Sequence, residues 1–262
     1  MKRLHIVIPC AAIAGLIMVG GLSASAQTLA LQLQATNYNA STGVWTDSSG
    51  NNDTATYSGS LTPVLVSGVT PTGSSAVRLS GNGSFLLASS IAPLSGYTVF
   101  AYIEPTTGVA RNALTGGSNP TALEYDVYQH NQDFLTEYTA DIGHGTAFVP
   151  TTSFSLVDLA VNSSGGAFRI DGSSDGTAAG TTFGQPITRI GNNEGGGDGF
   201  VGNIAEIDIY SGVLTTGQIL TLEGGLMSKY GTVTIPEPTT WAMMVGGFGM
   251  LLAVRRFRNP RA

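Results

Sequence analysis

The residues best suited to acid–base chemistry lie close together, at Glu206, Asp208 and Tyr210. They alternate with Ile207 and Ile209, which is the pattern of a β-strand with one polar and one apolar face. Two carboxyl groups on one strand face are an arrangement with which enzymes hydrolyse glycosidic bonds. A phenol, with an ordinary pKa of about 10, is a poor acid for a glycosidic oxygen. We therefore expect the three polar side chains to point together, with Ala205 and the two isoleucines in the core.

A second group of oxygen-bearing side chains lies near the start of the chain, at Asp47, Asn51 and Asp53. Hard oxygen ligands at such spacing are typical of a Ca²⁺ loop. Asp and Asn are also the usual residues of tight turns, so we interpret the group as a turn and predict no metal and no cofactor. The single cysteine, Cys10, lies in the first apolar run, which excludes a thiolate site from the remainder of the chain.

The elements that must position these residues are β-strands. Short alternating or apolar runs separated by Gly, Asn, Ser and Asp indicate a sandwich or jelly roll. We expect strands at 29–33, 76–79, 84–87, 97–103, 122–129, 154–161, 167–170, 187–190, 200–201 and 204–210. A hairpin loop is expected at 161–167 and a tight turn at Asp171-Gly172. The one helix signal is the capping box Thr215-x-x-Gln218, followed by an apolar face at Ile219, Leu222 and Leu226.

The N-terminus has the features of a secretory signal. Lys2 and Arg3 precede an apolar run at 6–22, and the small residues Ala24 and Ala26 bracket a cleavage site before Gln27. We predict that residues 1–26 are a signal peptide removed by signal peptidase. A retained membrane anchor is the alternative.

The C-terminus combines Pro236-Glu237-Pro238, an uncharged stretch of 16 residues at 239–254, and Arg255, Arg256 and Arg258. As a helix the stretch would measure about 24 Å against a bilayer core of about 30 Å, so it is a short transmembrane span. The arginines would hold the end of the chain in the cytoplasm. Residues 236–262 resemble the PEP-CTERM sorting segment of Gram-negative bacteria, which implies recognition by an exosortase and a transient stay in the inner membrane. An ordinary C-terminal anchor is the alternative.

The charge of the intervening chain restricts its partners. Between Thr28 and Ile235 there are five basic and 16 acidic residues, a net charge of −11. Such a surface repels phosphate backbones, so we expect no nucleic-acid binding. Neutral sugars, divalent cations or basic partners fit an exported protein of this charge.

Two further stretches carry recognisable motifs. One is GVWTDSSGNND at 43–53 with VRLSG at 77–81, and the other is FVGNIAEIDIY at 200–210 with Leu214 and KYG at 229–231. Together they resemble the laminin-G-like, concanavalin A-like lectin/glucanase superfamily. The resemblance implies an all-β, two-sheet antiparallel jelly roll over residues 27–235 with one short C-terminal helix. Lectins, adhesion modules and glycan hydrolases share this fold, so the fold alone does not settle function.

The resemblance also implies roles for single residues. Laminarinase-type glucanases carry Glu-x-Asp-x-Glu on a strand, with the nucleophile first and the acid/base last, and here Tyr210 stands in the place of the acid/base. The position of Trp45 implies packing on a strand rather than stacking on a sugar. Lectins of this type often bind ligands in the loop that here contains Asn192, Asn193, Glu194 and Asp198. We treat that loop as the candidate ligand loop, and His130 and His144 as incidental.

The sequence therefore favours an exported, non-enzymatic surface or extracellular-matrix protein with a lectin-like domain that binds carbohydrate or mediates adhesion. The alternative is a secreted β-glucan hydrolase of the laminarinase type with a degenerate catalytic strand. A structural component of the extracellular polymer without a discrete ligand is the third hypothesis.

Overall fold

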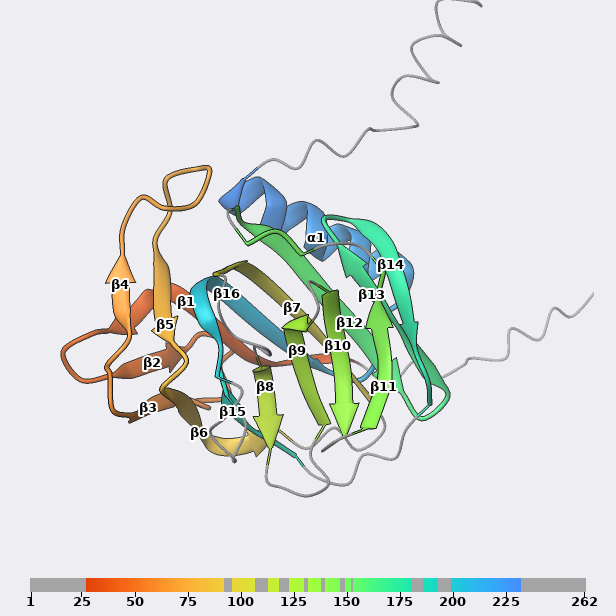
Figure 1. Cartoon of the computed structure of the whole chain (residues 1–262), viewed down its shortest axis with the longest axis horizontal. Coiled ribbons are helices and arrows are strands. Elements are labelled where there is room, and N and C mark those ends of the chain that lie inside the picture. The colour runs from red at the N-terminus through yellow and green to blue at the C-terminus, as the bar shows by residue number, and fades with distance from the viewer. Residues whose placement is uncertain are drawn as a thin grey trace, which may run out of the picture.

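The computed structural model describes residues 27–231 apart from gaps at 92–95, 107–112, 118–122, 130–131, 138–139, 147–148, 152, 181–185 and 193–198 (Figure 1). Within these residues the chain forms 16 strands and one helix. The strands are β1 (Thr28–Asn39), β2 (Val44–Asp47), β3 (Ala55–Gly59), β4 (Val64–Val66), β5 (Ala76–Ser80), β6 (Gly83–Ile91), β7 (Gly96–Pro105), β8 (Ala113–Gly117), β9 (Leu123–Gln129), β10 (Gln132–Glu137), β11 (Ala140–Gly145), β12 (Ser155–Asn162), β13 (Gly165–Ile170), β14 (Ser173–Ala178), β15 (Ile187–Ile190) and β16 (Val201–Ser211).

The strands form one antiparallel ladder in the order β1-β2-β3-β6-β15-β8-β9-β10-β11-β14-β13-β12-β7-β16-β5-β4. A further pairing of β1 with β16 closes the ladder into a ring and leaves β5 and β4 as a spur. The ring is folded into two facing layers, one with β12, β7 and β16 and the other with β8, β9 and β10 (Figure 1). The pairs β1–β2 and β11–β14 connect the layers at their two edges.

The main core lies between the two layers. Strands with alternating apolar residues contribute to it from both sides, among them Val99, Val157 and Ile207 from one layer and Phe85 and Tyr125 from the other. All five side chains are fully buried. Burial of this apolar surface is the main favourable contribution to the folding of a domain without disulfides.

The helix α1 (Thr216–Tyr230) adds a third layer, outside β7 and β12. Ile219 and Leu226 pack with Phe100, Tyr102 and the small Ala205 in a second apolar cluster. Because both faces of the central strands are thus covered, nearly every residue of β7 and β12 is buried.

Polar contacts hold α1 at its N-terminus and at its middle. The predicted capping box is confirmed, since the Thr215 side chain accepts from the Gln218 N–H and the Gln218 side chain accepts from the Thr215 N–H at 2.8 Å. Farther along, Arg169 on β13 forms an ion pair with Glu223, whose side chain is fully buried, with 2.6 Å between Nε and Oε1. The hydrogen bond and charge of Glu223 raise the pKa of Arg169. The helix is therefore held to the sheet through a charged pair as well as through apolar packing.

The predicted fold class, an all-β, two-sheet antiparallel sandwich with one short C-terminal helix, is confirmed. The strand at 187–190 has the expected bounds, and the expected strands at 200–201 and 204–210 are one continuous strand, β16. The turn at Asp171-Gly172 is confirmed too, with φ angles of 49° and 78° that a two-residue hairpin turn requires.

The predicted signal peptide, the sorting triplet Pro236-Glu237-Pro238 and the arginines Arg255, Arg256 and Arg258 lie outside the described residues. In the part of the chain that the structure describes, no helix combines the length and apolarity needed to cross a membrane.

Candidate functional site

Strand β16 carries the polar motif that the sequence singled out. Ile207 and Ile209 point into the main core, as expected. Ala205 does not, because the pairing with β7 shifts register between Ile204 and Glu206, a β-bulge that leaves Ala205 in the cluster beneath α1. The expectation that Ala205 faces the main core was therefore wrong, since a bulge interrupts the period of two.

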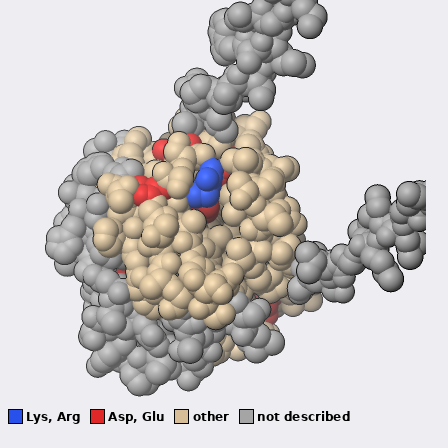
Figure 2. Space-filling model, turned by 90° about the vertical axis from the view of Figure 1, so that its right-hand side faces the viewer, with Lys and Arg blue, Asp and Glu red and all other residues tan. Residues whose placement is uncertain are grey.

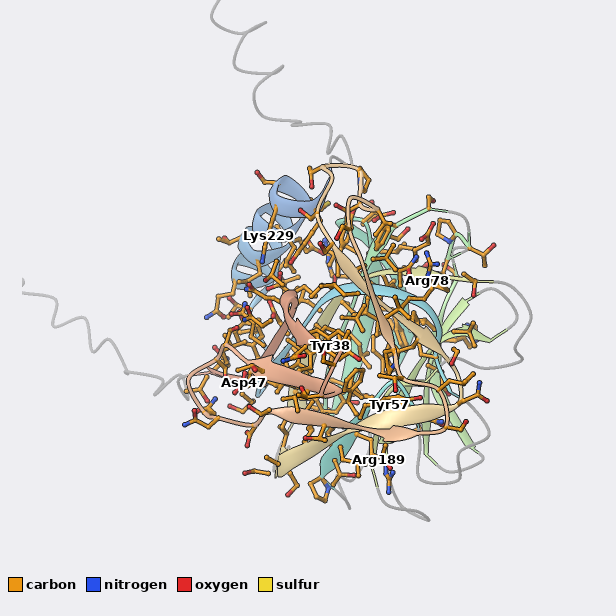
Figure 3. All side chains as sticks on the ribbon, turned by 90° about the vertical axis from the view of Figure 1, so that its left-hand side faces the viewer. Tyr38, Asp47, Tyr57, Arg78, Arg189 and Lys229 are labelled. Atoms are coloured by element: carbon orange, nitrogen blue, oxygen red, sulfur yellow. The ribbon has the colours of Figure 1, made fainter. Side chains whose placement is uncertain are left out.

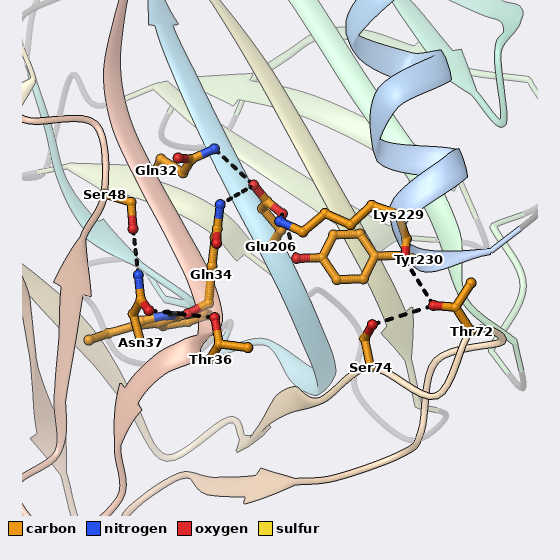
Figure 4. A network of polar contacts seen from close by, with 11 residues as sticks. Gln32, Gln34, Thr36, Asn37, Ser48, Thr72, Ser74, Glu206, Lys229 and Tyr230 are labelled. Atoms are coloured by element: carbon orange, nitrogen blue, oxygen red, sulfur yellow. Dashed lines mark hydrogen bonds and ion pairs between the residues drawn. The ribbon is translucent and has the colours of Figure 1, made fainter.

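Glu206 lies beneath the C-terminal turn of α1 and is only 2% exposed. Its Oε1 accepts hydrogen bonds from Gln32 Nε2 at 2.9 Å and Gln34 Nε2 at 3.2 Å, both on β1 (Figure 4). Its Oε2 accepts from Lys229 Nζ and from the Tyr230 hydroxyl, each at 2.5 Å. Four donors from two elements thus hold the carboxylate, which serves as the attachment point of the helix.

The attachment extends beyond Glu206 to the loop between β4 and β5. Thr72 donates its hydroxyl to the Lys229 carbonyl at 2.9 Å and its N–H to the Tyr230 carbonyl at 3.2 Å (Figure 4). These bonds satisfy two of the carbonyl groups that the end of a helix leaves without partners.

Asp208 shares the outer face of β16 and is 4% exposed. Burial and the charge of Glu206 raise its pKa to about 8. Among the described residues no donor reaches its buried Oδ1. A carboxyl group in this position keeps its proton at neutral pH, so Glu206 and Asp208 do not form a pair of ionised acids.

Tyr210, the third residue of the motif, lies at the end of the same face, where α1 begins. Its ring packs edge-on against Phe100 with 6.0 Å between centroids. Burial, together with the charges of Asp208 and Glu206, raises its pKa to about 12, so the phenol stays neutral. The predicted common face of Glu206, Asp208 and Tyr210 is confirmed, but α1 covers its first two residues.

Tyr210 forms part of a groove of about 570 Å³ between β16 and the first turns of α1. The groove is lined by Gln27, Tyr210, Leu214, Thr215, Gly217, Gln218, Thr221 and Leu222. Amide and hydroxyl groups surround one aromatic ring, and none of the lining side chains is charged. Gln27 is fixed at the rim, since its Nε2 donates to the Val213 carbonyl at 2.7 Å and its Oε1 accepts from Gln218 at 3.2 Å. The sequence analysis did not identify this groove, because Gln27 is distant in sequence from the residues of β16 and α1 that form its two walls.

The candidate calcium residues form a turn, as interpreted. Asp47 accepts hydrogen bonds from the N–H groups of Gln32 at 2.9 Å and Ser49 at 2.8 Å through Oδ1, and from that of Asp53 at 3.1 Å through Oδ2. Burial alone would raise the pKa of Asp47, but these bonds together lower it. Asn51 donates to the Leu29 and Ala30 carbonyls instead of offering oxygen ligands. The carboxylate of Asp47 thus ties the turn to β1, at the side of the molecule seen in Figure 3.

Trp45 packs inside the sandwich, as the resemblance implied. Its side chain is fully buried and its indole N–H donates to the Gln34 carbonyl at 2.7 Å. Tyr38 and Phe85 contact the ring edge-on, with centroids at 6.1 and 5.1 Å. It is therefore unable to stack on a sugar.

Of the candidate ligand loop, the structure describes only Asn192, whose side chain is 2% exposed. Asn193, Glu194 and Asp198 lie outside the described residues, as does His130. His144 is exposed on β11, with its Nδ1 2.7 Å from the Gly145 carbonyl.

Charged side chains are sparse on the face that holds β13 and β14. Figure 2 shows there one basic patch with a few acidic patches around it, and the other described residues visible in this view are uncharged.

Of the solved structures that resemble the chain in fold, three illustrate the range. The first is domain 4 of AbnA, an extracellular GH43 arabinanase from Geobacillus stearothermophilus solved with arabinotriose, with a TM-score of 0.58 and 19% identity over 75% of this chain and 98% of that one. The second is the binding domain of Paraclostridial Mosquitocidal Protein 1, with a TM-score of 0.55 and 15% identity over 76% of this chain and 52% of that one. The third is a Trypanosoma rangeli sialidase mutant displaying trans-sialidase activity, with a TM-score of 0.55 and 16% identity over 78% of this chain and 34% of that one. The chain spans about half of the second protein and a third of the third. At these identities the likeness shows the fold alone.

None of the curated proteins matches the chain in sequence. The family model of the concanavalin A-like lectin/glucanases superfamily, by contrast, matches residues 72–220, from the loop before β5 to the second turn of α1. As its name states, that superfamily includes both lectins and glucanases, so membership fixes the fold and leaves binding and hydrolysis both open. On this match, which spans more than half of its length, the chain belongs to the concanavalin A-like lectin/glucanases superfamily.

Proposed function

We propose that this chain is an exported bacterial surface or extracellular-matrix protein that binds carbohydrate, or mediates adhesion, without hydrolysing it. The observation that carries the proposal is the uncharged groove beside Tyr210 in a domain of a lectin-containing superfamily. Ligand sites combine apolar and aromatic surface with a few placed polar groups. A ring with amides and hydroxyls around it offers that combination to a sugar.

The charge of the groove indicates a neutral ligand. Gln27, Gln218, Thr215 and Thr221 supply donors and acceptors without a formal charge. An anionic ligand would meet no cation there and would be repelled by a chain whose segment 28–235 has a net charge of −11. A neutral glycan of the extracellular polysaccharide meets neither difficulty.

The burial of the two acids supports binding without hydrolysis. A glycoside hydrolase needs one ionised carboxylate and one proton donor beside the scissile bond. Here all four contacts of Glu206 are internal, and α1 covers both Glu206 and Asp208. A β-glucan would have to displace the helix to reach them.

The solved structures add a parallel for the extracellular setting. Domain 4 of AbnA belongs to an extracellular enzyme and was solved with arabinotriose, and the chain covers 98% of its length. An accessory domain that holds a glycan is the role we extend to this chain.

Export and sorting rest on the two ends of the sequence. The basic start, apolar run and small residues before Gln27 support a signal peptide at 1–26 cleaved by signal peptidase. Pro236-Glu237-Pro238, the apolar stretch and the following arginines support recognition by an exosortase in a Gram-negative bacterium, with the inner membrane as a transient stage.

A glycan array with the purified protein tests the proposal. Thr221→Lys places a charged chain in the groove and should weaken binding of a neutral glycan about tenfold, which corresponds to about 1.4 kcal/mol. Leu220→Lys is the matched control, because Leu220 is 48% exposed on the same helix but does not line the groove.

Two results would overturn the proposal. One is equal binding by the two variants, which would place the glycan elsewhere. The other is release of reducing ends from laminarin that stops in Glu206→Gln, which would make the protein a hydrolase.

A further inference from the structure

The spur of β5 and β4, outside the closed ring of strands, has one free edge along β4. β4 pairs with β5 through Val64↔Arg78, Leu65↔Val77 and Val66↔Ala76, and no other described strand pairs with it. The backbone N–H and C=O groups along its outer side are therefore open to another strand.

This edge lacks the charged side chains that often protect an edge strand. Proteins discourage strand addition with charged side chains or bulges on an edge. The stretch from Ser60 to Thr70 instead has no charged residue. Leu61 and Val64 are 55% and 57% exposed, and they are two of the three large apolar side chains that the described residues leave exposed. The short length of β4 and Pro63 directly before it restrain strand addition, so apolar contacts must supplement the few backbone hydrogen bonds that β4 can form.

An apolar hollow of about 370 Å³ lies beside the edge. Its lining includes Leu61 and Val64 together with Leu79 and Val201 from β5 and β16. The one charged residue in the lining, Arg78, donates from Nε to Asn203 Oδ1 at 3.0 Å, and Asn203 in turn donates to Glu104 at 2.5 Å. The positive charge of Arg78 is thus linked through Asn203 to the negative charge of Glu104.

We propose that two copies of this chain associate through their β4 edges, antiparallel about a twofold axis, with Leu61 and Val64 of each copy covering the hollow of the other. Antiparallel pairing of two identical strands is self-complementary, as a twofold interface requires. The exposed apolar side chains and the hollow lie on the same surface, so one rotation satisfies both.

Charge favours a second copy over other occupants. A strongly acidic or basic partner would find a single charged side chain at the edge, Arg78, which is linked to Glu104 through Asn203. Two copies of a chain this acidic repel one another over most surfaces, and the uncharged β4 edge is a place where they meet without that repulsion.

The proposed interface leaves the glycan groove open and goes beyond the proposed function. Val201 lines the hollow and Tyr210 lines the groove, at opposite ends of β16. They are nine positions apart along the strand, about 30 Å. A dimer would present two grooves at once, which raises avidity for a polymeric glycan without a new contact.

Sedimentation equilibrium of the full chain tests the interface. The unaltered protein should dimerise with a Kd in the micromolar range, and Val64→Lys should raise that Kd at least tenfold because two lysines would meet at the edge. Leu220→Lys, at the third exposed apolar residue, is the matched control and should dimerise normally. Melting temperatures of both variants show that each is folded.

A protein that stays monomeric at about 100 µM would overturn the proposal, since a micromolar Kd predicts a largely dimeric sample there. So would a dimer that persists in Val64→Lys, which another surface would then have to hold. Binding of single sugars is independent of this result, so failure of the dimer and failure of the glycan groove are distinguishable.

Discussion

On one face of β16, Ile204, Ile207 and Ile209 are fully buried among apolar side chains, while on the other Glu206 and Asp208 are buried almost as deeply beneath α1. The inner face satisfies burial by packing alone. The outer face needs a partner for every oxygen, and Glu206 receives four donors while Oδ1 of Asp208 receives none within the described residues. Equal burial therefore makes one face insensitive to pH and the other sensitive to it.

The largest effect is expected on the inner face. Ile207→Ala removes a fully buried side chain from the core between the layers and leaves a cavity. It should lower the free energy of unfolding by about 2–5 kcal/mol, as large-to-small core substitutions do. Urea unfolding at pH 5 and pH 8 should give the same loss, because no side chain of the described core cluster titrates between these pH values. A loss that differs between these pH values would break the distinction between the two faces.

The next effect concerns Asp208, whose folded-state pKa is raised to about 8 by burial and by Glu206. The groups around it are Glu206, Lys229, Gln32, Tyr210 and Tyr230. Below a pH of about 4 the carboxyl is protonated in both states. Between that pH and 8 only the folded state keeps the proton. The free energy of unfolding therefore falls as pH rises, by at most about 1.4 kcal/mol per pH unit.

Asp208→Asn should remove this dependence, because an amide does not ionise. The difference in unfolding free energy between variant and unaltered protein should favour the variant increasingly from pH 5 to pH 8 and then level off. Urea titrations at four pH values measure it, and Asp53→Asn, in the turn that Asp47 holds, serves as the control. A difference that stays constant with pH would mean that Asp208 is ionised throughout.

The comparison also shows what the sequence was able to predict. The alternation of Glu206, Ile207, Asp208 and Ile209 identified the strand and its two faces, because the period of two is a local property. It did not identify which face meets water, since the covering residues, Lys229 and Tyr230, come from a helix more than 20 residues later.

Other features that the sequence analysis did not predict also depend on residues distant in sequence, or leave no signal in the local sequence. The bulge at Ala205 depends on the partner strand β7 and leaves no mark in the sequence. Strand β14 reads SSDGTA and has no apolar alternation, so it is a strand only because β13 and β11 pair with it. The capping box at Thr215 and the turn at Asp171-Gly172, by contrast, are local hydrogen-bond and φ requirements, and both were predicted.

The smallest effect is expected within the outer-face network itself. Lys229 and Tyr230 contact the same oxygen of Glu206 at the same distance of 2.5 Å, but the Lys229 side chain is 42% exposed whereas Tyr230 is 4% exposed. Solvent screens the ion pair of Lys229, so Lys229→Gln should cost no more than about 1 kcal/mol. Tyr230→Phe deletes a buried donor and should cost about 1–3 kcal/mol, because a buried charged acceptor then loses a hydrogen bond.

Urea unfolding of the two single variants and of the double variant, each at 50 mM and 500 mM NaCl, separates the two contributions. The Lys229→Gln loss should shrink at high salt and the Tyr230→Phe loss should not, since only the exposed contact lies within reach of the counterions. Because the two donors share one acceptor, the losses should not add, and the double variant should lose more than the sum as Oε2 is left without either donor. Lys229→Gln could instead prove the more destabilising of the two substitutions. The exposed ion pair would then contribute more to holding the helix than the buried hydrogen bond, and depth of burial would not determine how much each contact on this face stabilises the fold.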